Sequence, residues 1–202
     1  GVGCAITVDQ EIKLLDRFLT WGWSYDVKQY PFFSTRIERL LKKIDCSKRS
    51  DYILYITTSA SKIYPDGMGI PSGKNFETCY LEWQYRFLQT LPEKYRKMLL
   101  LRVNPLDSRY GWNQQRRIDD LGLDIKIDSK TIYAESLSKA SMIVCDNNYT
   151  TFFESVAANI PTHLYFNIDC WCINKKALSL YEEMKAVGMF SDTPESAAKQ
   201  VA

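Results

Sequence analysis

The chain has 202 residues, of which 46% are hydrophobic and 25% are charged, values that are ordinary for a globular domain with a substantial core. Its formal net charge of +2 is too balanced to favour a nucleic acid or an anionic membrane surface as a partner. No apolar run approaches the roughly 18 residues that a membrane span requires, and no signal peptide is visible. Because the sequence begins with Gly1 rather than Met, we expect it to be a piece of a longer protein.

The cysteine and histidine residues show no pattern of a metal site. Cys145 lies in an apolar run and is expected in the core. Cys170 and Cys172 form a C-x-C pair, but no second cluster of Cys or His completes it, and the lone His163 lies in a predicted strand. This pattern favours reduced cysteines, a cytoplasmic chain and no bound metal.

The first 33 residues carry few signals of regular structure. An apolar cluster that ends at Phe18 and Leu19 predicts a short strand, which leads into the pair Trp21 and Trp23 around a glycine. The two indole rings either form a stacking wall for a ligand or cover an edge of the core, and the sequence leaves both interpretations open. We expect residues 1–33 to be a linker or interdomain segment and residues 34–202 to be the main domain.

A predicted helix opens the main domain, and from residue 51 onward predicted strands and helices alternate along the chain. Apolar residues at helical spacing predict helices over residues 34–44, 76–91, 92–97, 113–121, 132–140, 150–158, 174–187 and 193–202. Short apolar or alternating runs predict strands over residues 52–57, 98–103, 124–127, 142–145 and 162–166. This order predicts an α/β fold, a Rossmann-like and mainly parallel sheet with helices on both faces.

Three local expectations accompany these elements. Residues 62–75 are rich in Gly and Pro and predict a long surface loop. Asp128 or Ser129 is expected to cap the helix over residues 132–140. The helix over residues 174–187 is expected to turn one apolar stripe inward, made of Ala177, Leu180, Tyr181, Met184 and Val187.

Four loops follow the carboxyl ends of predicted strands, and in a parallel sheet they share the edge where α/β proteins bind ligands. These loops cover residues 58–61, 102–112, 147–151 and 167–171. The most informative of them joins a strand to the helix that Thr150 and Thr151 open, and free N–H groups at such a helix start attract phosphate. Glu154 lies one helical turn further and can face the same ligand.

The groups at this edge suit a nucleotide, and the candidate binding residues are Ser59, Arg102, Asn147, Asn148, Thr150, Thr151 and Glu154. Arg102 ends an apolar strand, where it either grips the phosphate of a ligand or pairs with a structural carboxylate. The chain lacks the glycine fingerprint of nicotinamide-cofactor domains and the P-loop motif. It also lacks the nucleophile elbow of Ser-His-Asp hydrolases, and no catalytic residue can be named.

Several segments resemble a family of bacterial transferases of surface-carbohydrate biosynthesis, of the O-antigen and lipopolysaccharide type. The segments are FLTWGWS (18–24), RFLQTL (86–91), LRVNPLDSRYGW (101–112), NNYTTFFESVAANIPTHLYF (147–166) and KAVGMFSDTPESAAKQV (185–201). Such proteins are similar to two-domain glycosyltransferases of the GT-B type. The resemblance implies that this chain is the C-terminal, nucleotide-sugar-binding half, and that a missing N-terminal domain would supply any general base.

The resemblance also implies roles for individual residues. In GT-B enzymes the segment that matches Thr150 to Glu154 binds the phosphates and the ribose of the donor, which implies phosphate contacts for Thr150 and Thr151 and a ribose contact for Glu154. Asp107 and Trp112 match family motif positions and join the candidate binding residues.

One departure from the family lies just after Trp171. The family usually has a Glu and an Arg there, where this chain has Cys172 and Asn174, so no charged contact is carried over to this region.

The function implied by the resemblance is transfer of a sugar from a nucleotide-activated donor to a glycan or lipid-linked acceptor, with no other cofactor. The chain alone is expected to turn over poorly, and to lie in the cytoplasm or at the inner face of the membrane. Two alternatives stay open. One is a CDP-polyol phosphotransferase of the teichoic-acid type, which usually has Asp-Tyr-Ser-Ser in place of residues 146–149. The other is a non-catalytic Rossmann-like interaction module, which a large exposed apolar face would favour.

Overall fold

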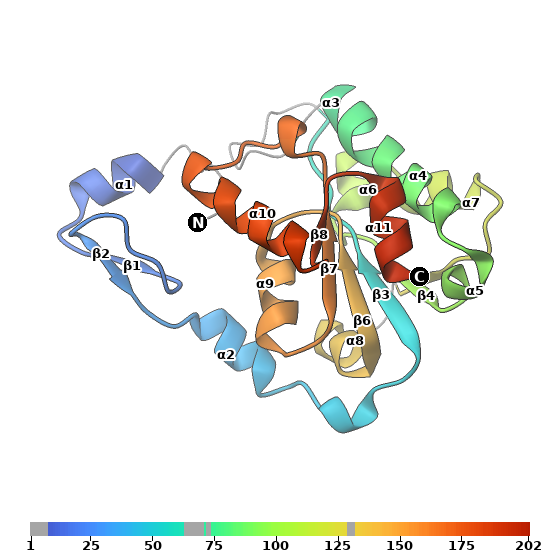
Figure 1. The fold of residues 1–202 in the computed structure, drawn as a ribbon, viewed down its shortest axis with the longest axis horizontal. Coiled ribbons are helices and arrows are strands. Elements are labelled where there is room, and N and C mark those ends of the chain that lie inside the picture. The colour runs from blue at the N-terminus through green and yellow to red at the C-terminus, as the bar shows by residue number, and fades with distance from the viewer. Residues whose placement is uncertain (1–7, 63–70, 72–73, 129–131) are drawn as a thin grey trace.

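The computed structural model describes residues 8–62, 71, 74–128 and 132–202. Within these residues the chain forms a six-stranded sheet with helices on both faces, in the strand order β5-β4-β3-β6-β7-β8 (Figure 1). The strands are β3 (Tyr52–Ile56), β4 (Leu99–Arg102), β5 (Lys126–Ile127), β6 (Ala140–Cys145), β7 (Thr162–Tyr165) and β8 (Phe190–Ser191). All of their pairings are parallel, which confirms the α/β, Rossmann-like prediction.

The chain order of the strands creates a division at the centre of the sheet. From β3 the chain adds β4 and β5 on one side, and it then returns to add β6, β7 and β8 on the other side. The loops after β3 and β6 therefore diverge, and crevices at such points hold the ligands of open α/β sheets. Leu54 and Tyr55 of β3 and Val144 of β6 are fully buried, because helices cover both faces of these central strands.

Two groups of helices cover the two faces of the sheet. Side chains of α4 (Glu82–Thr90), α7 (Gln114–Asp119) and α11 (Pro194–Val201) pack in one core cluster, around Tyr55 and Leu101. Side chains of α8 (Tyr133–Lys139), α9 (Thr150–Ala157) and α10 (Leu178–Ala186) pack in the other, around Leu54 and Ile143. The main domain also contains short helical segments, among them α5 (Glu93–Arg96), α6 (Asp107–Tyr110), and 3-10 turns at Cys46–Lys48, Ile168–Cys170 and Lys175–Ala177.

The N-terminal segment forms a small structure of its own. It contains α1 (Val8–Leu14), which the sequence did not predict, and a two-stranded parallel sheet of β1 (Phe18–Thr20) and β2 (Gln29–Pro31). Figure 1 shows this segment beside the main sheet, connected to it through α2 (Thr35–Leu41). Helix α2 contacts α9, so it ties the N-terminal segment to the helix that the sequence singled out.

The helix predicted over residues 76–91 has three consecutive parts. It begins as α3 (Lys74–Phe76), continues as a π-helical segment (Glu77–Leu81) and ends as α4. Insertions of π-helix are rare and lie frequently at functional sites. Here the segment carries Cys79 and Tyr80 to the carboxyl edge of the sheet.

Two of the local expectations are wrong. The N-cap of α8 is Ile132, whose hydrocarbon side chain makes no cap bond, and Asp128 accepts a hydrogen bond from Arg102 instead; Ser129 lies outside the described residues. Leu180 and Val187 are exposed rather than buried, whereas the other members of the α10 stripe face the core. Most of the loop predicted over residues 62–75 also lies outside the described residues.

Candidate functional site

The carboxyl edge of the sheet carries three groups of side chains. We call them the aromatic cleft, the Asp146 network and the Tyr133 group, and each is defined below by its residues. The parallel strands bring the predicted loops to this common edge, but the loops contribute to different groups.

The aromatic cleft is a cavity of about 570 Å³ between the N-terminal segment and helices α9 and α10. It is lined by Trp21, Trp23, Tyr25, Ile37, Asn148, Tyr149, Thr150, Phe153, Val156, Ala157, Lys176, Ala177 and Leu180. Trp21 and Trp23 both line this cavity, and the stacking of a ligand on them stays a prediction. The exposed Leu180 also lines it, which accounts for its departure from the buried stripe of α10.

Polar groups stand at one part of this otherwise apolar cleft. Thr150 begins α9, and the side chain of its N-cap Tyr149 accepts no bond from the first amides of the helix. The Asn148 amide donates to the hydroxyl of Tyr181 at 2.9 Å, which holds Asn148 beside Thr150. The ammonium group of Lys176 lies 4.7 Å from the centre of the Tyr25 ring. The cleft therefore combines stacking surfaces with a helix N-terminus and one cation.

The Asp146 network is a buried set of hydrogen bonds at the end of β6. The Oδ2 atom of Asp146 accepts bonds from the hydroxyls of Tyr55 and Tyr80, each at 2.9 Å, and from the Gln84 amide at 2.7 Å. Its Oδ1 atom accepts from the Asn147 amide at 3.0 Å. Burial raises the pKa of Asp146 to about 6, although the four donors act in the opposite direction. The network fixes the turn that leads into α9.

Two predicted binding residues, Ser59 and Asp107, extend this network and are buried. The Ser59 hydroxyl donates to Asp107 Oδ1 at 3.1 Å, and the side-chain and backbone N–H groups of Gln114 donate to the same carboxylate at 2.9 and 2.7 Å. The Gln114 amide also donates to the Thr58 carbonyl at 2.7 Å. These bonds join the loops that follow β3 and β4.

Trp112, also predicted to bind the nucleotide, is buried beside these loops. Its indole N–H donates to the Ala60 carbonyl at 2.6 Å, and its ring packs against Phe76 with 4.9 Å between ring centres. The ammonium group of Lys62 lies 4.7 Å from the centre of the same ring. Ser59, Asp107 and Trp112 therefore do not line the aromatic cleft.

The Tyr133 group contains two further predicted residues, Arg102 and Glu154, which both neighbour Tyr133. Arg102 donates to Asp128 Oδ2 at 2.7 Å, which is the structural pairing that the sequence left open as an alternative. The Arg102 guanidinium also lies 5.3 Å from the centre of the Tyr133 ring. Burial raises the pKa of Tyr133, and the charge of Glu154 raises it further. This charge effect shows that the phenol and the carboxylate are neighbours.

Glu154 belongs to the Tyr133 group and does not line the aromatic cleft with Thr150. Its side chain is 2% exposed, and its Oε1 atom accepts a bond from Arg36 Nε at 2.7 Å. Its Oε2 atom has no hydrogen-bond partner in the part of the chain that the structure describes. Thr151, also predicted to bind phosphate, is half-buried, and its carbonyl accepts a bond from Ser155 within α9.

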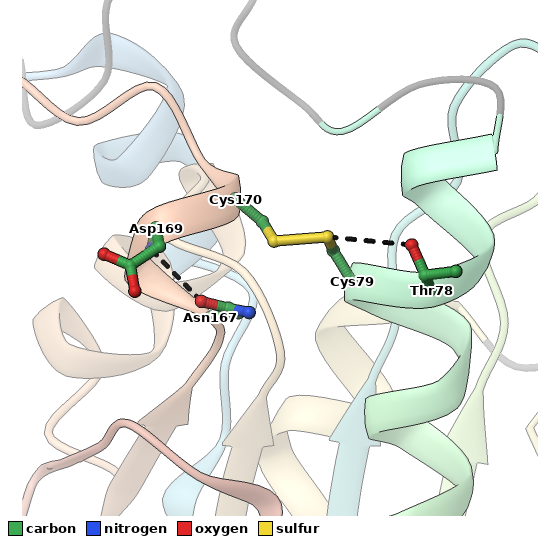
Figure 2. Close-up of a disulfide and its surroundings, with 5 residues drawn as sticks. All are labelled: Thr78, Cys79, Asn167, Asp169 and Cys170. Atoms are coloured by element: carbon green, nitrogen blue, oxygen red, sulfur yellow. Dashed lines mark hydrogen bonds between the residues drawn. A yellow bond between two sulfur atoms is a disulfide. The ribbon is translucent and has the colours of Figure 1, made fainter.

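A disulfide joins Cys79 of the π-helical segment to Cys170 after β7, with 6.1 Å between their Cα atoms (Figure 2). The prediction of reduced cysteines is wrong for this pair, because the fold brings together two residues that are 91 positions apart. Among the described residues Cys46, Cys145 and Cys172 are free. The ring of Trp171, next to Cys170, lies 5.6 Å from the ring of Tyr149, so the disulfide anchors a loop that packs against the cleft.

Several residues of these groups were not predicted to belong to a site. Gln84 and Gln114 are polar residues of predicted helices, and nothing in the sequence distinguishes them from glutamines on a solvent-exposed helix face. Asp146 was interpreted as the end of a strand, and Arg36 lies in a predicted helix but was given no role. By contrast, the expected structural role of His163 is confirmed, since its buried ring contacts the Gly188 carbonyl at 3.0 Å and the Ser191 hydroxyl at 3.1 Å.

Three further features of the described residues concern metal binding, membrane spans and a second groove. These residues contain no group of three or more His, Cys, Asp or Glu side chains that could hold a metal ion. None of the helices they form is long and apolar enough to cross a membrane. A second groove, of about 550 Å³, is lined by Trp21, Phe32, Phe33, Ser34, Ile37, Glu38 and Leu41. An exposed apolar surface of this kind is what the interaction-module alternative would require.

A parallel α/β sheet with helices on both faces and a cleft at its carboxyl edge defines a domain of the Rossmann-like class. The chain belongs to the LIC12162 family of transferases, because the model of that family matches residues 1–202. The resemblance to a transferase family that the sequence showed is thereby confirmed. None of the curated proteins searched is significantly similar to this chain.

Three solved structures show a distant likeness to the chain. The UDP-GlcNAc 2-epimerase of Methanocaldococcus jannaschii, in complex with UDP-GlcNAc and UDP, is 17% identical with a TM-score of 0.45, over 83% of this chain and 41% of that one. The wall teichoic acid polymerase TagF is 13% identical with a TM-score of 0.41, over 95% and 49%. WaaG, a glycosyltransferase involved in lipopolysaccharide biosynthesis, is 13% identical with a TM-score of 0.35, over 84% and 46%. The chain thus spans less than half the length of each of them.

Proposed function

We propose that this chain is the donor-binding half of a GT-B-type glycosyltransferase that transfers a sugar from a nucleotide-activated donor to a surface-polysaccharide or glycoconjugate acceptor. Membership in a transferase family supports the reaction class. The observation that carries the rest is the aromatic cleft at the start of α9, because it joins stacking walls to an uncapped helix N-terminus. Its volume lies within the range of about 300–1,000 Å³ that is usual for small-molecule sites.

The donor would use the two kinds of surface in the cleft separately. The planar base stacks on Trp23 or Tyr25, an interaction that favours aromatic rings over aliphatic ones. The diphosphate lies at the N-terminus of α9, where Thr150 and Thr151 contribute amides and hydroxyls and the helix dipole favours negative charge. Lys176 offsets part of the remaining charge.

Glu154 would contact the ribose in this proposal, as the family resemblance implies. The family resemblance alone supports this role, because the Glu154 side chain is 2% exposed, does not line the aromatic cleft and neighbours the Tyr133 hydroxyl.

The Asp146 network would keep this site in one geometry. Asp146 and Asn147 hold the turn before α9 through bonds to β3 and to the helix over residues 74–90, so the turn does not reorganise when the donor binds. Catalysis would then come from positioning the donor and from stabilising the leaving nucleotide. The acceptor site and any general base are proposed to lie on another domain.

The proposal is tested by titrating the chain with CMP, CDP, UDP and GDP compounds and measuring binding by isothermal titration calorimetry. We expect one base to be preferred, and Trp23→Ala to weaken its binding by about tenfold, since base stacking contributes roughly 1–3 kcal/mol. Tyr30→Ala is the matched control, because Tyr30 is an exposed aromatic residue of the same segment that does not line the cleft.

Three outcomes would contradict parts of the proposal. Binding of none of these compounds would contradict it as a whole. Equal effects of Trp23→Ala and Tyr30→Ala would show that the nucleotide does not use the aromatic cleft. Binding of CDP-glycerol in preference to every sugar nucleotide would favour the polyol phosphotransferase alternative instead.

A further inference from the structure

We propose that the Cys79–Cys170 disulfide is a redox switch of the donor site, and that its reduction loosens one wall of the aromatic cleft and weakens nucleotide binding. This inference rests on the proposed function, because the ligand whose binding is controlled is the same nucleotide-activated donor. The reductant is a dithiol, either a small molecule or a protein, and the experiments below use a small one.

The first observation is that the bond is accessible and joins two separate segments. Cys79 and Cys170 are both half-buried, and Figure 2 shows their bond bridging the π-helical segment and the loop after β7. Thiol–disulfide exchange requires such access to a sulfur atom. One thiolate of the reductant attacks a sulfur and displaces the other cysteine, and its second thiolate then resolves the mixed disulfide. Two electrons and two protons pass to the cysteines, and the reductant leaves as its own disulfide.

The second observation is that the residue after Cys170 packs against the aromatic cleft. The ring of Trp171 lies 5.6 Å from the ring of Tyr149, which is the N-cap of α9 and lines the cleft. A displacement of the loop at Cys170 is therefore transmitted directly to the place where the donor diphosphate is proposed to bind.

The third observation is that the residue after Cys79 holds the same helix start from the other side. The Tyr80 hydroxyl donates to Asp146 Oδ2 at 2.9 Å, in the turn that leads into α9. The rings of Tyr80 and Trp171 also meet edge to face, with 6.3 Å between their centres. The disulfide thus fixes two neighbouring aromatic residues that both support the start of α9.

The fourth observation concerns the other restraints on the loop over residues 167–171. Asn167 accepts bonds from the backbone N–H groups of Asp169 and Cys170, each at 3.1 Å, and both bonds stay within the loop. The buried indole N–H of Trp171 has no hydrogen-bond partner in the part of the chain that the structure describes. A buried donor without a partner is unfavourable, so release of the loop lets the indole gain a hydrogen bond to water. This gain favours departure of the ring from Tyr149.

The location that the sequence predicts agrees with a bond that opens and closes. The chain is expected in the cytoplasm, where disulfides, when present, are usually transient and either catalytic or redox-sensing. Neither cysteine lines the aromatic cleft, so a sensing role fits this pair better than a catalytic one.

The experiment compares the nucleotide affinity of the oxidised chain with that of the chain reduced by dithiothreitol. The probe is whichever of CMP, CDP, UDP and GDP binds most tightly in the titrations above. We expect reduction to weaken binding at least threefold, because the apparent affinity falls with the fraction of molecules in which the cleft wall stays in place. Removal of the reductant and reoxidation should restore the original affinity.

Two variants serve as controls for the reductant. Cys79→Ser should bind the nucleotide as weakly as the reduced parent and should not respond to dithiothreitol. Cys46→Ser should respond as the parent does, because Cys46 is a free and exposed thiol.

Amide hydrogen exchange without nucleotide tests the structural part of the switch by itself. We expect reduction to raise exchange in residues 147–153 and 167–171 but not in β4, while circular dichroism verifies the fold. An increase spread over the whole chain, or loss of the fold on reduction, would indicate a purely structural bond and overturn the inference.

The results also distinguish this inference from the proposed function. If the oxidised and reduced chains bind the nucleotide equally well, the inference is overturned and the proposed function stands. An equal response of Cys79→Ser to dithiothreitol would overturn it too, since the reductant would then act elsewhere. If the oxidised chain binds no nucleotide, the proposed function fails, and unchanged exchange at the start of α9 would overturn the switch separately.

Discussion

Cys79 and Cys170 are covalently joined across the carboxyl edge of the sheet, although 91 positions separate them in the sequence. The bond ties the π-helical segment, which supplies Tyr80 to the Asp146 network, to the loop whose Trp171 packs against Tyr149 of the aromatic cleft. Two groups of the candidate site are therefore linked by a single covalent bond. This relationship leads to the first of four predictions.

Removing the disulfide should lower the free energy of unfolding. A disulfide that closes a long loop typically stabilises a protein by about 2–4 kcal/mol, mainly because it restricts the unfolded chain. We therefore expect Cys79→Ser to lower the urea midpoint, and a reducing agent to produce the same change in the parent chain. Cys46→Ser is the control, because Cys46 is a free and exposed thiol. If the reductant leaves the parent's midpoint unchanged, the disulfide does not contribute to stability.

Asp146 should give the stability of the protein a characteristic dependence on pH. Burial raises its pKa from the ordinary value of 3.8 to about 6, so between these values the folded state binds the proton more tightly than the unfolded state. The stabilising contribution of this group is thus fully present below about pH 4 and is lost as the pH rises through about 6. A shift of about two pKa units corresponds to about 3 kcal/mol.

The measurement is the difference in unfolding free energy between the parent chain and Asp146→Asn, from urea titrations at several pH values. The difference is needed because other carboxyl groups act in the opposite sense; for example, the hydrogen bond from Arg86 lowers the pKa of Glu195. We expect the parent to lose stability relative to the variant between pH 4 and pH 7. A pH-independent difference would show that Asp146 does not titrate in this range.

Asp128→Ala should destabilise the protein without affecting nucleotide binding. Asp128 is buried and accepts bonds from Arg102 at 2.7 Å and from the Ser136 hydroxyl, so its removal leaves a largely buried guanidinium without its charge partner. Loss of one member of such a pair costs about 3–5 kcal/mol. Urea unfolding measures the loss, and Lys97→Ala, in an exposed pair with Glu93, is the control that should change little.

The same variant separates the two interpretations of Arg102. If Arg102 is a structural partner of Asp128, nucleotide affinity at a temperature where the variant is folded should be unchanged. A specific loss of affinity for nucleoside diphosphates would indicate instead that Arg102 contributes to phosphate binding.

Glu154 should make the site discriminate between ribose and 2′-deoxyribose. If its Oε2 atom accepts a bond from a ribose hydroxyl, the parent chain should bind the 2′-deoxynucleotide several-fold more weakly than the ribonucleotide. Glu154→Ala should bind the two equally. Parallel titrations measure the ratio, and a parent chain that already shows no preference would remove the ribose role from Glu154.

The secondary structure of the main domain followed from local patterns in the sequence. The continuous apolar run at Tyr52–Ile56 and the stripe that includes Phe76, Tyr80 and Phe87 predicted a covered strand and an amphipathic helix. These predictions held because burial on a sheet or against a helix imposes a period of two or about four residues on the sequence itself. The parallel sheet then followed from the alternation of strands and helices.

The partners of polar side chains could not be predicted in this way. Arg102 was equally compatible with a ligand phosphate and a structural carboxylate, and only the structure places it against Asp128. Likewise, a glutamine such as Gln84 on an apolar stripe gives no indication of what it binds. Hydrogen bonds, ion pairs and disulfides form between residues that are distant in the sequence, and the sequence carries no period that reports them.

The sequence by itself determined that Thr150 begins a helix at the carboxyl edge of a parallel sheet, because strand, turn and helix signals are local. Only the tertiary structure decided which of its neighbours face a common cavity. It turned Glu154 away from Thr150 toward Arg36, and it brought Trp23 of the N-terminal segment onto the opposite wall. The direction of a side chain and the packing of remote segments depend on the whole chain, and these two features define the candidate site.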